Sequence, residues 1–392
     1  MLQSLAAGIA CLLALAEPPT AGPYAEPKPV RLGPRTTAPE TAWKGLDAQI
    51  DGLRDAMRHA PAQAEFRIQL AESLVARTVF AGSYADFDEA MGVLDPKPAV
   101  HDLELARASL LSSLHRFGDA GKLVRQHGKG SPRAEELLSN LDLANERNLP
   151  AVVERRRKAA EKTRTYASLV SLAAAVGATG DFEGADDLYV EALRVHRDVS
   201  PFPYAWVAFQ RGVMWAEVAG DARRAVPLYR EALRRLPGYV VATVHLAELE
   251  AEFGERTAAI GRLQDVLTKT QDPEPYGLLS ELLAESEPKR AAELVAEAKR
   301  RYEVLLERHG PAFWDHAAEF FSGPGGDPRR ALDLATRNLK NRPTQRARLV
   351  AIGAAHAAKD RAALCKLVRK APAVVTSRPL ADALAEHRPT CK

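Results

Sequence analysis

Apolar positions recur along most of this chain with the spacing of amphipathic helices, and near its middle one pattern occurs twice. Gly220 and Gly254 lie 34 residues apart, and Ala225 and Ala259 are separated by the same interval. A period near 34 residues that contains two helical patterns is typical of stacked helix–turn–helix arrays. One such unit cannot bury its apolar face alone, so the pattern predicts an all-α solenoid in which neighbouring units stack. Sustained alternation with β-branched residues is lacking, and we expect no strands.

Related units occur on both sides of this pair. In three of them an aspartate follows the turn glycines, where its carboxylate can cap the second helix: Asp181, Asp221 and Asp327. A proline then stops a helix before the next unit begins: Pro237, Pro273 and Pro343. The repeats are clearest over residues 164–343 and more divergent over 44–163. We expect residues 344–392 to form a last helix pair and a C-terminal capping helix.

These units resemble the tetratricopeptide repeat family. The family usually has a Trp early in the first helix, where this chain has Leu169 and Phe209, so individual copies are divergent. The resemblance implies a right-handed α-solenoid of stacked helix–turn–helix repeats, and a concave face that binds peptides or partner proteins. It does not identify the partner, because one fold serves many functions.

The N-terminus reads as an export signal. Residues 5–16 are apolar and end in Ala14-Leu15-Ala16, a small-x-small motif for leader peptidase, although the first four residues contain no Lys or Arg. The apolar run is too short to span a bilayer, which needs roughly 20 residues. We therefore expect a signal peptide over 1–16 and a Pro-rich tether over 17–43. The alternatives are a lipid anchor on Cys11 and an Ala/Leu-rich start that directs no export.

After removal of the leader, two cysteines remain, Cys365 and Cys391. An even pair in an exported chain indicates a disulfide, which would pin the C-terminus to the last helix pair. In a cytoplasmic chain the same two residues would be free thiols.

Composition and motifs indicate no chemistry of their own. The 54 basic and 51 acidic residues leave a formal charge of +3, which gives no net-charge argument for nucleic acid. Glycine-rich phosphate loops, nucleophile elbows and metalloprotease motifs are missing from the sequence, and the histidines lack ligand spacing. We therefore predict no metal, no cofactor and no catalytic residue. The basic run at residues 154–158 is interpreted as a solvated helix face.

One set of acidic residues is a better candidate for a binding site than the rest of the sequence. Repeat alignment places two glutamate pairs in register on groove-facing helices, and a further glutamate near the same line one repeat earlier. Like charges four residues apart cost a few tenths of a kcal/mol, so folding alone does not favour them. The interpretation is an acidic groove for a basic partner segment, and the alternative is ordinary solvated surface. The predicted partner-binding residues are Gln210, Met214, Glu217, Glu248, Glu252, Glu281, Glu285 and His316.

The sequence thus favours a non-enzymatic scaffold of the bacterial cell envelope, exported to the periplasm, that binds a protein or peptide in its concave groove. We expect no nucleic-acid partner and no transmembrane span. Two other functions stay open: an enzyme or enzyme subunit with a site in the divergent region 44–163, and a cytoplasmic adaptor with the same repeat fold.

Overall fold

The computed structural model describes residues 36–95 and 100–391. The predicted signal peptide, Cys11 and most of the predicted tether lie outside these residues. Within them, all regular secondary structure is helical, which is the all-α solenoid that the periodicity predicts.

The helices of the N-terminal half have between 9 and 21 residues. In chain order these are α1 (Pro39–His59), α2 (Ala64–Ala81), α3 (Ala85–Val93), α4 (His101–Ser113), α5 (Phe117–His127), α6 (Pro132–Ala144), α7 (Leu149–Lys162), α8 (Tyr166–Ala178) and α9 (Phe182–Val195). Helix α1 begins inside the range assigned to the tether, because Pro39 occupies its first turn, where a missing backbone N–H costs nothing.

The C-terminal half continues the same arrangement. It contains α10 (Pro201–Val213), the π-helical turn η1 (Met214–Val218), α11 (Ala222–Arg235), α12 (Val240–Glu252), α13 (Arg256–Leu267), α14 (Glu274–Leu283), α15 (Pro288–Ser322), α16 (Pro328–Asn341), α17 (Gln345–Ala357), α18 (Arg361–Arg369), α19 (Arg378–His387) and the 3-10 turn η2 (Arg388–Cys391). Helix α15 is two helices joined at a kink, since His309 has non-helical dihedrals and Pro311 follows it.

Successive helices pack as antiparallel hairpins, and the hairpins stack. Ala225 and Ala259, the small residues of the repeated pattern, are both fully buried between helices. The predicted caps are confirmed: the carboxylates of Asp181, Asp221 and Asp327 each accept a hydrogen bond from a backbone N–H in the first turn of their helix. The repeat spacing therefore identified both the tight helix contacts and the helix starts.

The π-helical turn η1 was not foreseen from the sequence. It follows a close approach in which Gly212 packs against the ring of Tyr229, where an added Cβ would come within 2.4 Å of a ring carbon. Beside it, the buried guanidinium of Arg211 forms two hydrogen bonds with the carboxylate of Asp186, at 2.6 and 2.9 Å. The wider turn directs Trp215 Nε1 to the same carboxylate, at 3.3 Å.

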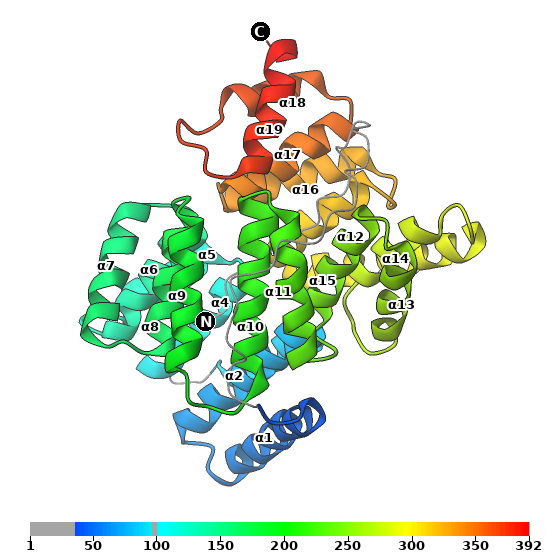
Figure 1. Ribbon diagram of the computed structural model, residues 1–392. Coiled ribbons are helices and arrows are strands. Elements are labelled where there is room, and N and C mark those ends of the chain that lie inside the picture. Colours follow the sequence, from blue (N-terminus) through cyan, green and yellow to red (C-terminus); the bar gives the residue numbers. More distant parts are fainter. Residues whose placement is uncertain (1–35, 96–99, 392) are drawn as a thin grey trace.

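The stack of hairpins curls until it contacts itself (Figure 1). Tyr84 Oη, after α2, donates a hydrogen bond of 2.7 Å to the carboxylate of Asp272, which lies 188 positions later. Asn341 Nδ2, at the end of α16, donates to the carbonyl oxygen of His115 at 2.9 Å, across 226 positions. The Gln345 N–H donates to Glu146 Oε2 at 3.0 Å. Helices from the two halves therefore lie against one another, and the inner side of the curl is closed.

The C-terminus is fixed to the last hairpin. The structure joins Cys365 in α18 to Cys391 in η2 by a disulfide, with Cα atoms 5.0 Å apart. Both residues are buried in a cluster formed by α17, α18 and α19. In this arrangement α19 covers the end of the array, as expected for a capping helix.

The packing of small residues between hairpins gives a direct test. Ala259 is fully buried in α13, whereas its neighbour Ala258 is exposed. We expect Ala259→Phe to lower the free energy of unfolding by about 1–3 kcal/mol through overpacking. Ala258→Phe, which adds the same ring to the same helix, should change it by less than about 0.5 kcal/mol. Chemical denaturation measures both, and equal stability of the two variants would contradict the register assigned to this repeat.

Candidate functional site

The inner face of the solenoid is formed by the first helices of consecutive hairpins, and the predicted partner-binding residues all lie on or beside these helices. Gln210 lies on α10, Met214 and Glu217 in η1, Glu248 and Glu252 on α12, Glu281 on α14, Glu285 just after α14, and His316 on α15. The structure separates them into a buried group and an exposed group. Binding of a partner by these residues stays a prediction.

Three members of the buried group, Glu217, Glu248 and His316, belong to a larger set of ionisable side chains. These side chains come from η1, α12, α14, α15 and α17 and contact one another across the inner face. We call this set the inner-face cluster: Glu217, His245, Glu248, Glu274, Asp315, His316, Glu319 and Arg346.

His245 lies between two glutamates of the cluster. Its Nδ1 is 3.3 Å from Glu217 Oε1 and 3.7 Å from Glu248 Oε2. Burial, with the positive charges of Arg346 and His316, lowers the pKa of His245 to about 3, so the ring is neutral at physiological pH. Burial, with the nearby charges of Glu274 and Glu217, raises the pKa of Glu248 well above its ordinary value. This part of the cluster therefore favours uncharged side chains.

His316 is one of the two cations of the cluster, with Arg346. Its Nδ1 contacts the carboxylate of Glu274, and its Nε2 lies 3.7 Å from Asp315 Oδ1. Burial opposes protonation, but the charges of Glu274 and Asp315 outweigh it and raise the pKa of His316 to about 10. Against the cost of burial, the positive charge of His316 holds the pKa of Asp315 below its ordinary value. An imidazolium therefore stabilises two buried carboxylates.

Two further carboxyls have pKa values near neutrality. Burial raises the pKa of Glu319 to about 7, although Arg346 Nη2 donates a hydrogen bond to its carboxylate. Burial and the charge of Glu274 raise the pKa of Asp272, the hydrogen-bond acceptor of Tyr84, to about 7. Such values are found at catalytic sites and also in buried structural networks.

The volume available beside these carboxyls distinguishes a catalytic site from a buried structural network. The cavity bordered by Tyr84, Asp272, Glu274 and His316 measures about 10 Å³. A single water molecule needs roughly 10–15 Å³ of such volume, so this part of the cluster has no room for a substrate. The contacts of His316 in this part of the cluster are ion pairs with Glu274 and Asp315 of the same chain.

A larger cavity of about 200 Å³ adjoins the cluster. Three of the predicted residues line it, Gln210, Met214 and Glu217, opposite the segment that joins α16 to α17. The groove expected along this part of the inner face is thus narrowed to a cavity of about 200 Å³, because the segment between α16 and α17 borders it.

The exposed group comprises Glu252, Glu281 and Glu285, which we call the acidic rim. Glu252 and Glu285 are exposed and Glu281 is partly so, at the C-terminal ends of α12 and α14. Within residues 36–95 and 100–391, no ion pair of 4.0 Å or less involves any of the three. Burial raises the pKa of Glu252 and of Glu281 above the ordinary value.

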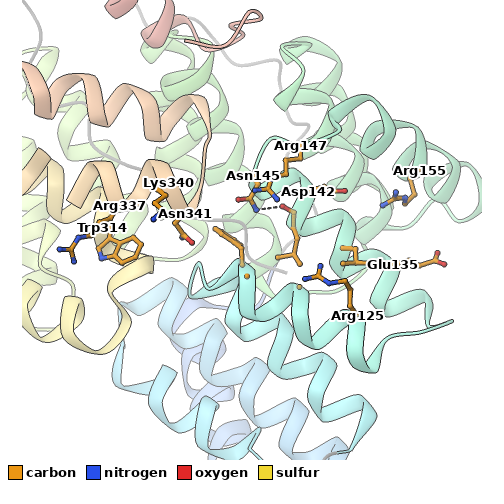
Figure 2. A pocket seen from close by; sticks show the side chains of 15 residues that line it. Arg125, Glu135, Asp142, Asn145, Arg147, Arg155, Trp314, Arg337, Lys340 and Asn341 are labelled. Carbon is orange, nitrogen blue, oxygen red and sulfur yellow. Dashed lines mark hydrogen bonds between the residues drawn. The ribbon is translucent and has the colours of Figure 1, made fainter. Parts of the chain in front are cut away.

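A second surface was missed by the sequence reasoning. A groove of about 1090 Å³ runs between α5–α7 on one side and the α15–α16 hairpin on the other. Figure 2 shows basic side chains from both walls around it. We call it the inter-turn groove; its charged lining residues are Arg125, Glu135, Asp142, Arg147, Arg155, Arg337 and Lys340. These positions share no motif or spacing, since the groove exists only where two distant parts of the chain meet.

The basic run at residues 154–158 also shows that sequence alone does not distinguish surface residues from buried ones. Arg155 is exposed and lines the inter-turn groove. Arg156 is an exception to the solvated-face interpretation: it is buried, and its guanidinium donates to the Ser171 carbonyl and to Asn140 Oδ1, both at 2.7 Å. One run of like charges thus supplies a surface residue and a packing residue.

Metal-ligand sets and membrane helices were also sought. Among the described residues, no group of three His, Cys, Asp or Glu side chains is placed to hold a metal ion. In the same part of the chain, none of the helices combines the length and the apolar character needed to cross a bilayer.

The raised pKa of His316 predicts a pH dependence of stability. Between about pH 7 and 9 the folded protein keeps a proton on His316 that the unfolded chain has released, so the free energy of unfolding should fall as pH rises. The slope should approach about 1.4 kcal/mol per pH unit. Denaturation across this range should show a clearly shallower slope for His316→Gln. His101→Gln, at an exposed histidine, should keep the wild-type slope. Equal slopes for the wild type and His316→Gln would contradict this assignment.

Comparison with known proteins addresses the repeats directly. The sequence model of a tetratricopeptide repeat family matches residues 219–282, which contain α11 to α14. A search among curated proteins finds no similar sequence.

Several solved structures are similar in part. They include the APC/C hetero-tetramer Cut9-Hcn1 (12% identity, TM-score 0.44, covering 82% of this chain and 62% of that one). Naa15/Naa10 bound to HypK-THB is similar at 14% identity and TM-score 0.33, covering 85% and 63%. Yeast Tom70 is similar at 12% identity and TM-score 0.34, covering 88% and 95%. The chain spans less than two thirds of the first two. It contains tetratricopeptide repeats, matched by sequence over residues 219–282 within a stacked α-solenoid.

Proposed function

We propose that this protein is a non-enzymatic scaffold that binds a basic segment of a partner protein along its acidic rim. One observation carries the proposal: Glu252 and Glu281 lie within the matched repeats, on the first helices of successive units, and Glu285 follows directly. Repeats of this kind are interaction modules, since stacking builds an extended surface from neighbouring units.

The chemistry of the rim favours a cationic partner. Burial raises the pKa of Glu252 and Glu281, which means that the surroundings do not supply enough positive charge to favour ionisation. A Lys or Arg from a partner would lower both pKa values again. Partner binding and ionisation of the rim therefore support each other.

Charge reversal tests the rim. Glu248 is unsuitable because it lies in the inner-face cluster, so the variant is Glu252→Lys with Glu285→Lys, both at exposed positions. We expect its affinity for a labelled Lys/Arg-rich peptide to fall about tenfold, from the loss of two exposed ion pairs of about 0.2–1 kcal/mol each and new repulsion. Added salt should weaken binding to the wild type. Fluorescence anisotropy measures both effects.

The matched control carries the same change in net charge elsewhere. Glu293→Lys with Glu307→Lys alters two exposed glutamates on α15, away from the rim. This variant should bind the basic peptide as the wild type does. If both double variants bind equally, the rim is ordinary solvated surface and the proposed binding mode is wrong.

We further propose that the protein is exported and acts at the bacterial cell envelope. Two observations support this: the apolar N-terminal run that ends in Ala14-Leu15-Ala16, and the disulfide between Cys365 and Cys391. Disulfides persist in oxidising compartments and are rare in the cytoplasm. The cytoplasmic adaptor is the alternative, and it predicts two reduced thiols.

Mass spectrometry of protein purified from its native host tests this location. Export predicts a chain that begins at Glu17, and no thiol labelling of Cys365 or Cys391 in the unfolded, unreduced protein. A lipid-modified Cys11 would replace the soluble periplasmic form with an anchored one. An intact Met1 together with two labelled cysteines would identify the cytoplasmic adaptor instead.

Two cavities are lined mostly by described residues of the region 44–163. The inter-turn groove contains two carboxylates, Glu135 and Asp142, whereas the second, smaller cavity gives an enzymatic site little support. The cavity between α2 and α4 measures about 290 Å³, and Glu72 is its one ionisable lining residue among those described. General acid–base chemistry requires a second positioned group. The cavity between α2 and α4 therefore does not support the enzymatic alternative, and the proposal of a binding scaffold rests on the acidic rim.

A further inference from the structure

The inter-turn groove has the size and the rigidity of a binding site. Its volume of about 1090 Å³ slightly exceeds the range of small-molecule sites, roughly 300–1,000 Å³, and leaves room for a short extended peptide. Contacts between the turns hold its two walls in place: Asn341 Nδ2 donates to the His115 carbonyl at 2.9 Å, and Arg342 Nε donates to the Ala144 carbonyl at 3.0 Å. A ligand would thus meet a preformed surface, which lowers the entropic cost of binding.

The charge of the groove is positive and comes from both walls. It contains five basic side chains and two acidic ones, Glu135 and Asp142. Among the described residues, Arg337 forms an ion pair with Asp333 at 2.8 Å. No ion pair within the same residues joins Arg125, Arg147, Arg155 or Lys340 to a carboxylate. All four are exposed, so their charges are available to an anionic ligand.

Between these charges the lining is partly apolar. The indole of Trp314 stands beside Arg337 in Figure 2, and Phe117, Leu138 and Leu141 contribute further apolar surface. A partly buried tryptophan next to arginine is a common anchor point in protein interfaces. The groove can therefore receive an apolar side chain as well as carboxylates.

Asn145 is a buried polar residue of the groove lining. It lines the groove, is 4% exposed, and its Nδ2 donates to the Leu141 carbonyl at 2.8 Å. Its Oδ1 is buried and has no hydrogen-bond partner among the described residues. A buried acceptor without a partner is costly, but this atom has no surface that a ligand in the groove could contact. The apolar surface beside the basic side chains is what favours a peptide with an apolar side chain over a simple phosphate anion.

We propose that the inter-turn groove binds an extended acidic segment of a partner protein, with its carboxylates on the basic walls and one apolar side chain against Trp314. This goes beyond the proposed function, because the acidic rim is a different surface that takes a partner of opposite charge. The chain would then hold two segments of opposite charge at separate places.

Charge reversal of one residue from each wall tests the proposal. Arg147→Glu with Lys340→Glu alters two exposed side chains, and the probe is a short labelled peptide of alternating Glu and Asp with one central Phe. We expect its affinity to fall at least about tenfold in this variant, and to weaken with salt in the wild type. The control Lys299→Glu with Lys366→Glu makes the same charge change at exposed positions on α15 and α18 and should bind as the wild type does.

Three further measurements complete the test. Unchanged thermal melting of the groove variant would show that it is folded. The rim variant Glu252→Lys with Glu285→Lys should bind the acidic peptide at least as well as the wild type, which separates this proposal from the proposed function. Replacing the central Phe of the probe by Ser should weaken binding to the wild type. Equal binding by the groove variant and its control, or tight binding of a single-stranded oligonucleotide without binding of the peptide, would overturn the proposal.

Discussion

The closure of the hairpin stack on itself is the constraint on which the rest of this structure depends. In a simple solenoid each repeat contacts only its neighbours, so its two ends are independent. Here the Tyr84–Asp272, Asn341–His115 and Gln345–Glu146 hydrogen bonds join segments roughly two hundred residues apart. These bonds connect the divergent N-terminal hairpins to the clear repeats. They add long-range contacts that a linear array of repeats lacks.

Closure determines the chemistry of the inner face. Carboxylates that would be solvated in an open groove are covered by other parts of the chain, and desolvation disfavours their charged form. The structure accommodates this in two ways. Glu248, Glu319 and Asp272 have raised pKa values, while the cations His316 and Arg346 stabilise the carboxylates beside them. A buried set of this kind is weak evidence for stability, but removal of one partner leaves an uncompensated charge.

The same closure leaves two kinds of charged surface on the outside. The C-terminal ends of α12 and α14 carry the exposed or partly exposed glutamates of the acidic rim. The meeting of α5–α7 with α15 and α16 creates the inter-turn groove, whose charge is of the opposite sign. One belongs to individual repeats, and the other exists only because distant repeats meet. A balanced formal charge of +3 for the whole chain conceals this separation.

The sequence by itself determined the local architecture. Local features depend on contacts within a hairpin or between neighbouring hairpins, which a periodic pattern encodes directly. They include the 34-residue spacing of Gly220 and Gly254, the burial of Ala225 and Ala259, and the aspartate caps. The sequence also placed the candidate glutamates on the correct helices. Tertiary structure decided which of these glutamates are buried. It also decided that Arg156 is buried while Arg155 lines a groove, and that η1 is a π-helical turn. These features depend on contacts between residues far apart in the chain. The angle between successive hairpins sets where the turns of the solenoid meet. That angle results from many small packing differences, which produce no periodic pattern in the sequence.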